Sequence, residues 1–369
     1  MSWDLTDARA LYARSWARLV LRRHRPRVVA VTGSGGKTTT TEAIAAVLEH
    51  PEAREKVGRV GTTRSNMNSD LMLPLAVLGY TSFPGSSLDQ AMLMGHVPWR
   101  ALSLLASRRY PHVFVAECGA GRHGDVRRSA QLVRPLVGVV TAVGPAHLAH
   151  FGSVEAIARA KASLVEAVPV HGRVILGADN EHSAAMRDRC RAPVVLVPGR
   201  GADLAKGIAR AVAEYFALPR DTVERALDGV APLPGRQHTV RTALVTVIDD
   251  AYNANPLSMR LGLDSLFDED PGPGGRRVAV LGYMVELGPE TTAYHAEIGA
   301  YARARADFVI GIGELARHYR PDLWFATAED CAATAQDWLR SGDRVLVKGS
   351  HVVRMSLVVN ALVAFSRAS

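Results

Sequence analysis

Residues 28–41, VVAVTGSGGKTTTT, determine the fold of this chain. Four apolar residues that favour β-strands lead into a glycine-rich turn, and helix-forming residues continue from the turn to Leu48. This strand–turn–helix order is typical of a P-loop, in which backbone N–H groups and the start of the helix bind phosphate oxygens. The Lys37 amine adds a positive charge, and the Thr38 hydroxyl is a suitable Mg²⁺ ligand. The stretch predicts a nucleoside triphosphate site with these binding residues: Gly33, Ser34, Gly35, Gly36, Lys37, Thr38 and Thr39.

One position departs from the general P-loop pattern, G-x-x-x-x-G-K-[ST]. The first glycine of that pattern would fall at Val31 in this chain. The alternative interpretation is an ordinary glycine turn before a helix. The run GGKTTT directly after an apolar strand favours the phosphate-binding interpretation.

The composition places limits on the class of protein. The chain has 369 residues, which is enough for two or three domains with their own cores. Its cysteines, Cys118, Cys190 and Cys331, are far apart in the sequence and match neither a disulfide framework nor a zinc site. We find no signal-peptide pattern and no run of 18 or more apolar residues. These features predict a cytoplasmic protein without a membrane partner.

The net charge of +8 comes almost entirely from arginine, because only five of the 44 basic residues are lysines. The basic residues are densest at 22–27, RRHRPR, where no aromatic residues are interleaved. We interpret this cluster as a solvated helix end and predict no nucleic-acid partner. Anionic small substrates explain the positive charge more simply. A lysine retained in such a chain suggests a role that arginine cannot fill.

Strands alternate with helices along residues 28–234, which predicts an α/β domain with a doubly wound, mostly parallel sheet of the P-loop NTPase type. Glu117, His147 and Asn180 each follow an expected strand. Ligands of such sheets bind beyond the carboxyl ends of the strands, so we expect these side chains near the phosphate site. The sequence PLPG at 232–235 predicts a boundary, and residues 235–369 form a second, Rossmann-like α/β pattern.

Residues 1–27 precede the P-loop strand, and most of them form one expected helix over 7–23. We expect a single apolar stripe of that helix to be packed, made of Leu11, Tyr12, Trp16, Leu19 and Val20.

Two later stretches are expected to be irregular. Residues 58–74 form a polar loop that carries Asn66 and Asn68. Residues 80–98 contain two prolines and two glycines, and we expect a mobile excursion that is either a substrate-facing lid or a surface loop. The next helix is expected over 99–109.

In their order, the motifs of the chain resemble those of the Mur ligase family, whose members use ATP to join a carboxylate to an amine. Within that family the chain is most similar to the branch that adds D-alanyl-D-alanine to UDP-N-acetylmuramoyl-tripeptide. The resemblance extends from Val28 to Val359, and its specificity comes from the order of the motifs. They are TGSGGKTTT at 32–40, ECGAGRHGDV at 117–126, GPAHLAHFGSVEAIARAK at 144–161, ADN at 178–180, PGR at 234–236, DDAYNANPLSM at 249–259, LGYMVELG at 281–288 followed by His295, and VLVKGS at 345–350.

The resemblance implies roles for individual residues around the triphosphate. Lys37 and Thr38 would contact the β- and γ-phosphates of ATP and a first Mg²⁺, and Glu117 would be a ligand of that ion. His147 would hold a second Mg²⁺ beside the γ-phosphate. Lys161 matches a lysine that is carbamoylated in the family, a modification that turns a cation into an anion able to stabilise that metal site. Taken singly, Glu117, His147 and Lys161 also fit an ion pair, a strand-end cap and a surface lysine.

The resemblance also assigns the rest of the site. Asn180 would contact adenine, Arg236 the phosphates and Asp250 the ribose. Lys348 would face the amine substrate or the reaction centre. The expected substrate-binding residues are Asn66, Asn68, Asn253 and Asn255.

The implied reaction has two steps. A substrate carboxylate attacks the γ-phosphoryl group to give an acyl phosphate and ADP, and an amine then displaces phosphate from the acyl carbon. Two Mg²⁺ ions and Lys37 offset the repulsion between the carboxylate and the triphosphate. The partners are therefore small-molecule carboxylate and amine substrates.

Several substrate-side positions differ from the family. Asparagine is usual where Ala142 and Gly177 stand, glutamate where Ser163 stands and aspartate where Tyr283 stands. Residues 1–27 are also too short to form the family's N-terminal UDP-binding domain. We therefore predict an acceptor other than a UDP-muramoyl peptide, with specialised metabolism as one setting for it. The alternatives are a nucleotide-binding subunit whose partner protein supplies the substrate domain, a true cell-wall peptide ligase, and a nucleic-acid-stimulated ATPase, for which we find no supporting module.

Overall fold

The computed structural model describes residues 5–63 and 67–368. They form two compact units. Unit 1 contains the described residues up to 143 and residues 153–230, and unit 2 contains residues 144–152 and the described residues from 231 onward. Among the described residues, no helix is long and apolar enough to cross a membrane.

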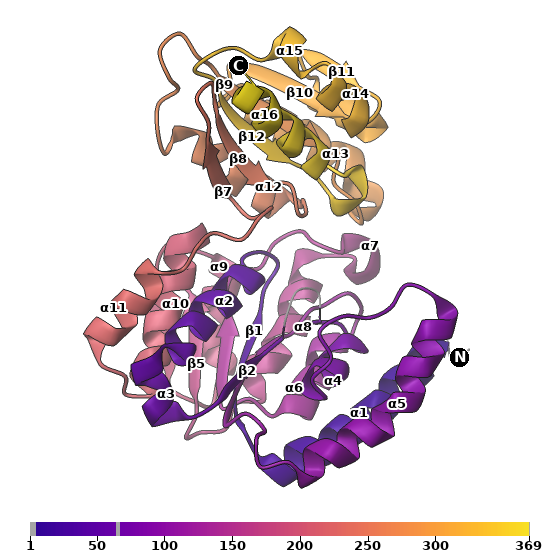
Figure 1. The fold of residues 1–369 in the computed structure, drawn as a ribbon, viewed down its shortest axis with the longest axis vertical. Helices are drawn as coiled ribbons and strands as arrows, with labels where there is room; N and C mark the ends of the chain where they lie inside the picture. Colours follow the sequence, from indigo (N-terminus) through magenta and orange to yellow (C-terminus); the bar gives the residue numbers. More distant parts are fainter. Residues whose placement is uncertain (1–4, 64–66, 369) are drawn as a thin grey trace. The chain divides into compact units, whose positions relative to one another are not determined.

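Unit 1 is built on a six-stranded parallel sheet in the order β2-β3-β1-β4-β5-β6 (Figure 1). The P-loop strand β1 lies between β3 and β4, so the turn that follows it opens at the carboxyl edge, where this type of sheet binds ligands. The strands are β1 (Arg27–Thr32), β2 (Val60–Thr62), β3 (Val113–Glu117), β4 (Val137–Val140), β5 (Arg173–Gly177) and β6 (Val194–Val197).

Helices cover both faces of this sheet. Val29, Val115 and Val139 point to one face, where they join α2 and α10 in a single buried apolar cluster. Each fully buried valine or leucine contributes about 1.5–3 kcal/mol, so this cluster is a main source of stability for unit 1. On the other face α6 packs against α8, and α1 packs against α4, α5 and α6. The helices are α1 (Leu5–His24), α2 (Lys37–Glu49), α3 (Pro51–Val57), α4 (Met72–Val77), α5 (Ser87–Ala106), α6 (Asp125–Val133), α8 (Val154–Glu166), α9 (Glu181–Ala184), α10 (Gly201–Tyr215) and α11 (Arg220–Asp228), with a 3₁₀ turn η1 (Ala185–Arg189).

Unit 2 has a second six-stranded sheet, in the order β11-β10-β9-β12-β8-β7. Its strands are parallel except β7, which pairs antiparallel with β8 at one edge. The strands are β7 (His238–Arg241), β8 (Thr246–Asp250), β9 (Arg277–Gly282), β10 (Phe308–Ile312), β11 (Leu323–Phe325) and β12 (Arg344–Lys348). The helical elements are α7 (Leu148–Phe151), α12 (Pro256–Asp264), η2 (Ser265–Phe267), η3 (Gly288–Glu290), α13 (Thr291–Arg303), η4 (Glu314–Tyr319), α14 (Ala328–Ala333), α15 (Ala335–Trp338), η5 (His351–Val353) and α16 (Ser356–Ala368).

The α/β fold class predicted from the sequence is confirmed: unit 1 has the parallel sheet and unit 2 has the second α/β sheet. The sequence did not indicate the short strands β2, β6, β7 and β11. Strand β8 covers Thr246–Asp250, so Asp249 and Asp250 lie within the strand. Residues 144–152 group with unit 2, although they lie within the sequence range expected for the first domain.

The expectation of an irregular excursion over 80–98 is wrong from Ser87 onward, where α5 begins. The Ser86 side chain caps this helix by accepting a hydrogen bond from the Asp89 N–H. The helix then continues through Gly95 and Pro98, although both residues disfavour helix. Packing of α5 against α1 stabilises it in the folded chain.

The expected packing of α1 is wrong for three of its five residues, whereas Val20 is buried as expected and Trp16 is half-buried. Leu11, Tyr12 and Leu19 are exposed, and the buried face is built largely of alanine. Because alanine has a small side chain, this face lets neighbouring helices approach α1 closely. The larger apolar side chains are left on the surface. The residues that are buried are Ala10, Ala13, Ala17, Val20 and Leu21.

Candidate active site

The P-loop turn connects β1 to α2 in unit 1. Gly36 is the N-cap of α2 and has a left-handed backbone conformation (φ 77°), which favours glycine. The Ser34 N–H donates to the Ala142 carbonyl at 2.7 Å and anchors the turn to the segment after β4. No acidic residue lies in the first turn of α2. Its N–H groups and positive helix end therefore suit an anion such as phosphate.

Thr141 and Gly33 make the closest contact in this region. A Cβ atom at Gly33 would lie 1.9 Å from Thr141 Oγ1, so only glycine fits without a shift. The same hydroxyl donates to the Gly35 carbonyl at 2.6 Å. On the other side of Thr141, a Cβ atom at Gly177 would lie 2.1 Å from its carbonyl oxygen. Thr141 therefore fixes the shape of the phosphate turn, a role that the sequence did not reveal.

Glu117 lies at the carboxyl end of β3 with only 5% of its surface exposed. Thr38 Oγ1 donates to one carboxylate oxygen at 2.8 Å, and Asn68 Nδ2 donates to the other at 2.7 Å. The Glu117 N–H donates to Thr63 Oγ1 at 2.8 Å. The carboxylate thus joins the P-loop helix to the segment that carries Asn68. Metal binding by Glu117 and substrate binding by Asn68 remain predictions. Asn66 lies outside the described residues.

Lys161 projects from α8 and is almost fully buried. Its Nζ donates to the Gly33 carbonyl at 2.9 Å, and Lys37 Nζ donates to the same oxygen at 3.1 Å. Burial lowers the pKa of Lys161 well below its usual value, and the neighbouring Lys37 charge lowers it further. A lowered pKa favours the uncharged amine, which is the nucleophilic form of a lysine side chain.

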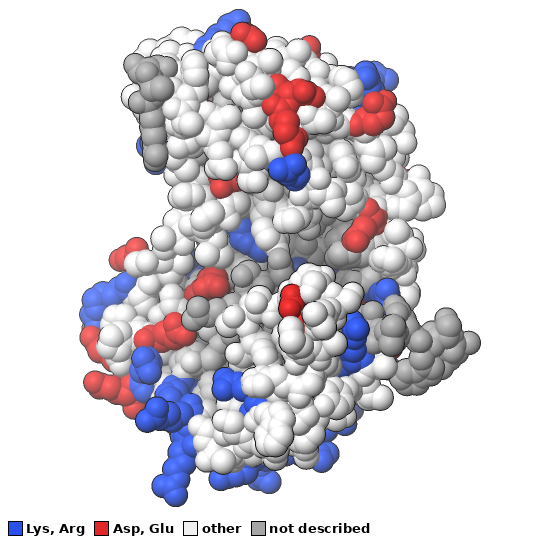
Figure 2. Space-filling model, turned by 45° about the vertical axis from the view of Figure 1, so that its right-hand side comes forward, with Lys and Arg blue, Asp and Glu red and all other residues white. Residues whose placement is uncertain are grey.

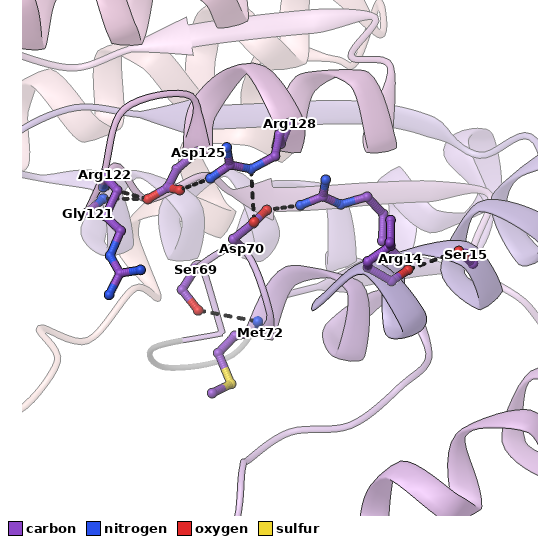
Figure 3. A network of polar contacts seen from close by, with 10 residues as sticks. Arg14, Ser15, Ser69, Asp70, Met72, Gly121, Arg122, Asp125 and Arg128 are labelled. Atoms are coloured by element: carbon purple, nitrogen blue, oxygen red, sulfur yellow. Dashed lines mark hydrogen bonds and ion pairs between the residues drawn. The ribbon is translucent and has the colours of Figure 1, made fainter. Parts of the chain in front are cut away.

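Figure 3 shows a network of ion pairs beside this region. Asp70, two residues after Asn68, lies between two arginines. It pairs with Arg14 from α1 and with Arg128 from α6, the latter at 2.9 Å. These contacts connect α1 to the segment that hydrogen-bonds Glu117.

The same network reaches the loop that follows β3. Arg128 also pairs with Asp125, the first residue of α6. The second carboxylate oxygen of Asp125 accepts hydrogen bonds from the N–H groups of Gly121 and Arg122, at 3.0 and 2.7 Å. Both segments that flank Glu117 are therefore held by one chain of charges, which the sequence analysis did not identify.

Asn180 begins α9 and bridges to the end of the β4 segment. Its Oδ1 accepts from the N–H groups of Val143 and Ser183, and its Nδ2 donates to the Val143 carbonyl at 2.9 Å. Both the oxygen and the nitrogen of the side-chain amide therefore bond to backbone groups and hold them in position. The adenine contact expected for Asn180 remains a prediction.

Lys348 and Asp250 form a buried ion pair in unit 2, with Nζ 2.7 Å from Oδ2. Lys348 Nζ also donates to the Asn253 carbonyl at 2.9 Å. Burial raises the pKa of Asp250, and the Lys348 charge opposes that rise. Lys348 is only 1% exposed, so in this arrangement it positions the loop after β8 and does not present its amine to a substrate.

Asp249 holds the backbone next to Arg236, another residue predicted to bind the nucleotide. Its carboxylate accepts from the Gly235 N–H at 2.7 Å and from the Ala251 N–H at 3.2 Å. Arg236 follows Gly235, and its guanidinium carbon lies 3.9 Å from the centre of the Tyr252 ring. The loop before β7 and the loop after β8 are thus held together.

The two asparagines of the DDAYNANP motif differ in their surroundings. Asn255 is the N-cap of α12 and forms a capping box with Ser258. The side chain of Asn253 is exposed. The cap is a structural role for Asn255, and substrate binding by either asparagine remains a prediction.

His147 lies in the 144–152 segment of unit 2, in the left-handed conformation (φ 56°). Its Nδ1 pairs with Glu286, another residue of positive φ. His295, noted in the same motif set, is buried: the Met284 N–H donates to its Nε2, and its Nδ1–H donates to the Thr291 carbonyl. His295 therefore has a structural role.

The residues present in unit 1 suit Mg²⁺ bound together with phosphate. Among the described residues there is no cluster of three or more His, Cys, Asp or Glu side chains that could hold a metal unaided. Glu117 and the Thr38 hydroxyl would supply two oxygen ligands. Mg²⁺ commonly takes few protein ligands, with phosphate oxygens and water completing its coordination.

A P-loop after the central strand and a buried carboxylate on the P-loop threonine define unit 1 as a nucleotide-binding α/β domain. Two family models match the chain, the Mur ligase middle domain over residues 31–213 and the Mur ligase glutamate ligase domain over residues 235–351. The chain belongs to the Mur ligase family, as its motifs indicated. It is an ATP-dependent, ADP-forming amide ligase.

Curated relatives support the same family. The UDP-N-acetylmuramoyl-tripeptide–D-alanyl-D-alanine ligase of Mycobacterium tuberculosis (strain ATCC 25618 / H37Rv) is 33% identical over 405 residues, covering 91% of this chain and 73% of the relative. The enzyme of the same name from Escherichia coli (strain K12) is 27% identical, with 91% of this chain and 76% of the relative covered.

Solved structures share the fold. The MurF ligase of Thermotoga maritima in complex with ADP superimposes with a TM-score of 0.79 at 23% identity, covering 97% of this chain and 84% of that one. Escherichia coli FolC in complex with DHPP and ADP gives a TM-score of 0.66 at 18% identity, covering 98% and 93%.

The first prediction concerns the ion-pair network. Asp70→Asn leaves Arg14 and Arg128 without their shared carboxylate, and we expect a loss of about 1–2 kcal/mol in the free energy of unfolding because the pairs are only partly solvated. Urea denaturation measures this. Glu329→Gln removes an exposed pair with Arg354 and serves as the matched control, for which we expect almost no change. Equal stability of the two variants would contradict the prediction.

The second prediction concerns the P-loop lysine. Lys37→Ala removes the charge that faces the phosphates, and we expect ADP release to fall at least about 100-fold. Circular dichroism and the melting temperature should stay close to wild type. Lys206→Ala, on α10, is the control and should retain full turnover. Near-native ADP release by Lys37→Ala would show that the P-loop assignment is incorrect.

Proposed function

We propose that this chain joins a carboxylate to an amine through an acyl phosphate. The observation that best supports this is the contact of the buried Glu117 carboxylate with Thr38 at the start of the P-loop helix. A protein that only binds a nucleotide would need the P-loop but not this carboxylate. A buried carboxylate at the P-loop threonine adds a metal ligand beside the γ-phosphate, which phosphoryl transfer requires.

The bond changes follow from that arrangement. A carboxylate oxygen of the acid attacks the γ-phosphorus, the bond to the β–γ bridging oxygen breaks, and ADP leaves. The amine nitrogen then attacks the acyl carbon, loses a proton and expels inorganic phosphate. The P-loop N–H groups and Lys37 orient the phosphates throughout. Bound Mg²⁺ offsets the negative charge on the transferring group.

We further propose that Lys161 carries a carbamate. Its buried, uncharged amine can attack CO₂, and the resulting anion would lie next to the Lys37 ammonium, because both side chains reach the Gly33 carbonyl. Arginine cannot form this group readily, which accounts for a lysine in an arginine-rich chain. His147 would hold a second Mg²⁺ in the completed site.

The remaining assignments of the motifs also stay part of this proposal. They place Asn180 at adenine, Arg236 at the phosphates, Asp250 at the ribose and Asn68 at the acid. The exposed Asn253 side chain is available to a substrate, whereas Lys348 would act through the loop that it holds.

Two acceptors are candidates. The named relatives favour a UDP-muramoyl tripeptide as the acid and D-alanyl-D-alanine as the amine. The residues at the substrate-side positions favour a different, more compact acid. At Gly177, where the family usually has asparagine, even a Cβ atom would collide with the Thr141 carbonyl. This part of the site therefore cannot supply the amide that the family uses there.

The third prediction tests the carbamate. Lys161→Ala should lose most of its activity, and added acetate or formate should restore part of it by supplying a small carboxylate. Wild-type protein equilibrated with ¹³CO₂ should show a carbamate carbon signal by NMR that Lys161→Ala lacks. A fully active Lys161→Ala variant, or no difference between the two spectra, would reject the carbamate.

The fourth prediction tests the acyl phosphate. Acid substrate labelled with ¹⁸O in its carboxylate should deliver one labelled oxygen to inorganic phosphate, because that oxygen leaves with the phosphate when the amine attacks. Mass spectrometry of the phosphate measures the transfer. Label found in AMP would instead indicate adenylation of the acid.

The fifth prediction distinguishes the acceptors. Purified chain is assayed for ADP release with UDP-muramoyl tripeptide plus D-alanyl-D-alanine, and separately with a panel of amino-acid-like and peptide-like acids and amines. We expect turnover to be greater with a member of the panel. Efficient amide formation with the UDP-linked pair would identify a cell-wall ligase, and turnover that requires a second protein would favour the two-subunit alternative.

A further inference from the structure

The outer face of α5 carries six exposed positions spaced 4, 3, 4, 3 and 4 residues apart. Four of them hold large apolar side chains, and Trp99 and Leu88 are 72% and 71% exposed. The opposite side of the helix contains the buried Val97 and Ala101. The six positions, here called the α5 seam, are Leu88, Met92, Gly95, Trp99, Leu102 and Ala106.

This spacing is the seam of a coiled coil, in which apolar residues alternate three and four apart and pack into a facing helix. Such a seam is unusual on a surface because it exposes a continuous apolar strip. The corner of unit 1 that carries α1 and α5 comes forward in Figure 2, where it is mostly uncharged with Lys and Arg along its lower margin. Between Ser87 and Ala106 the helix has only two charged side chains, Asp89 and Arg100.

We propose that the α5 seam binds the α5 seam of a second copy of this chain, antiparallel about a two-fold axis near Val97. That axis places large side chains opposite small ones: Trp99 faces the partner's Gly95, and Leu88 faces the partner's Ala106. Met92 faces the partner's Leu102. The seam is thus complementary to itself, as a two-fold interface requires.

Gly95 gives this proposal its most specific support. A glycine within a helix costs about 1 kcal/mol relative to alanine. Among the described residues nothing lies within 4 Å of the position that a Gly95 Cβ would take, so packing within the chain gives no reason for glycine. The glycine is explained if the space that it leaves on the helix surface accepts Trp99 of a second copy. Tryptophan is a preferred anchor residue of protein interfaces.

The charges at the helix ends favour the antiparallel direction. Asp89 lies in the first turn of α5, and the exposed Arg108 and Arg109 follow its end. Antiparallel packing brings these arginines towards the partner's Asp89, whereas parallel packing would bring four arginines together.

The neighbouring helix α1 also has an acidic residue near its start and basic residues near its end. It runs in the same direction as α5, because Arg9 bonds Gln90 near one end and His24 bonds the Leu104 carbonyl near the other. Asp7 lies in its first turn and Arg22 in its last. Leu11 and Leu19 of α1 are also exposed apolar residues of this part of unit 1.

An anionic bilayer is the competing occupant, and two features disfavour it. The seam contains Gly95 and Ala106, which would bury little apolar surface in lipid. Asp89, at the start of the helix, would be repelled by anionic headgroups.

Light scattering coupled to gel filtration tests the proposal on the full chain. We expect wild type to have twice the 39.6 kDa mass of the single chain. Gly95→Trp blocks the seat of the partner's Trp99, and its dimer dissociation constant should rise at least about tenfold. Its melting temperature, measured below the dissociation constant of the dimer, should not fall, because the new side chain enters open space within the chain.

The exchange variant Gly95→Trp with Trp99→Gly restores one large residue opposite one small residue across the axis. We expect it to recover the dimer, which a loss of folding or of general hydrophobicity could not explain. Phe267→Gln, at an exposed apolar residue of unit 2, is the control and should leave the dimer unchanged.

Three outcomes would overturn the proposal. They are a monomeric wild type at tens of micromolar, a dimer that Gly95→Trp does not weaken, and an exchange variant that stays monomeric. Flotation with vesicles of phosphatidylcholine and phosphatidylglycerol tests the competing occupant. Binding of a monomer to these vesicles through Trp99 would assign the seam to a lipid surface instead.

Discussion

The Gly33 carbonyl is the point on which the phosphate site depends. Two lysines from different helices donate to this one oxygen, and the Thr141 hydroxyl leaves no room for a Cβ atom above it. Two full positive charges so close together in a buried place are costly, and the cost is avoided if one amine is neutral. Lys161 is almost fully buried, and this burial lowers its pKa. The reactivity proposed for Lys161 is thus a consequence of the backbone geometry of a single glycine.

Charge is also what holds the surroundings of the site in place. Asp70 and Asp125 connect α1, α6 and the two segments beside Glu117, and Asp249 and Asp250 do the same for the loops around β8 in unit 2. In each unit, carboxylates near the ends of the strands accept backbone N–H groups or basic side chains. The motifs read as substrate contacts therefore also contain residues that position others, and Lys348 and Asn255 are two of them.

The sequence was sufficient for the parts of the structure that have local signals. The P-loop, the central strands and the position of Glu117 at a strand end follow from apolar runs, glycines and spacing. Contacts between distant segments have no such signal: Thr141 on Gly35, Asp70 between two arginines and His147 on Glu286 depend on the folded chain. The part of α5 before Trp99 was missed because Gly95 and Pro98 usually end a helix. The buried face of α1 was misjudged because its residues are mostly alanine.

The edges of both sheets have a consequence for how this chain can assemble. The edge strands β2 and β11 have three residues each, and β6 and β7 have four. Strands this short offer few unpaired backbone groups, so another chain gains little by adding a strand there. This protects both units against sheet-to-sheet aggregation. It also favours self-association through side chains, as on helices, where register is set by the shape of residues and not by a repeating backbone.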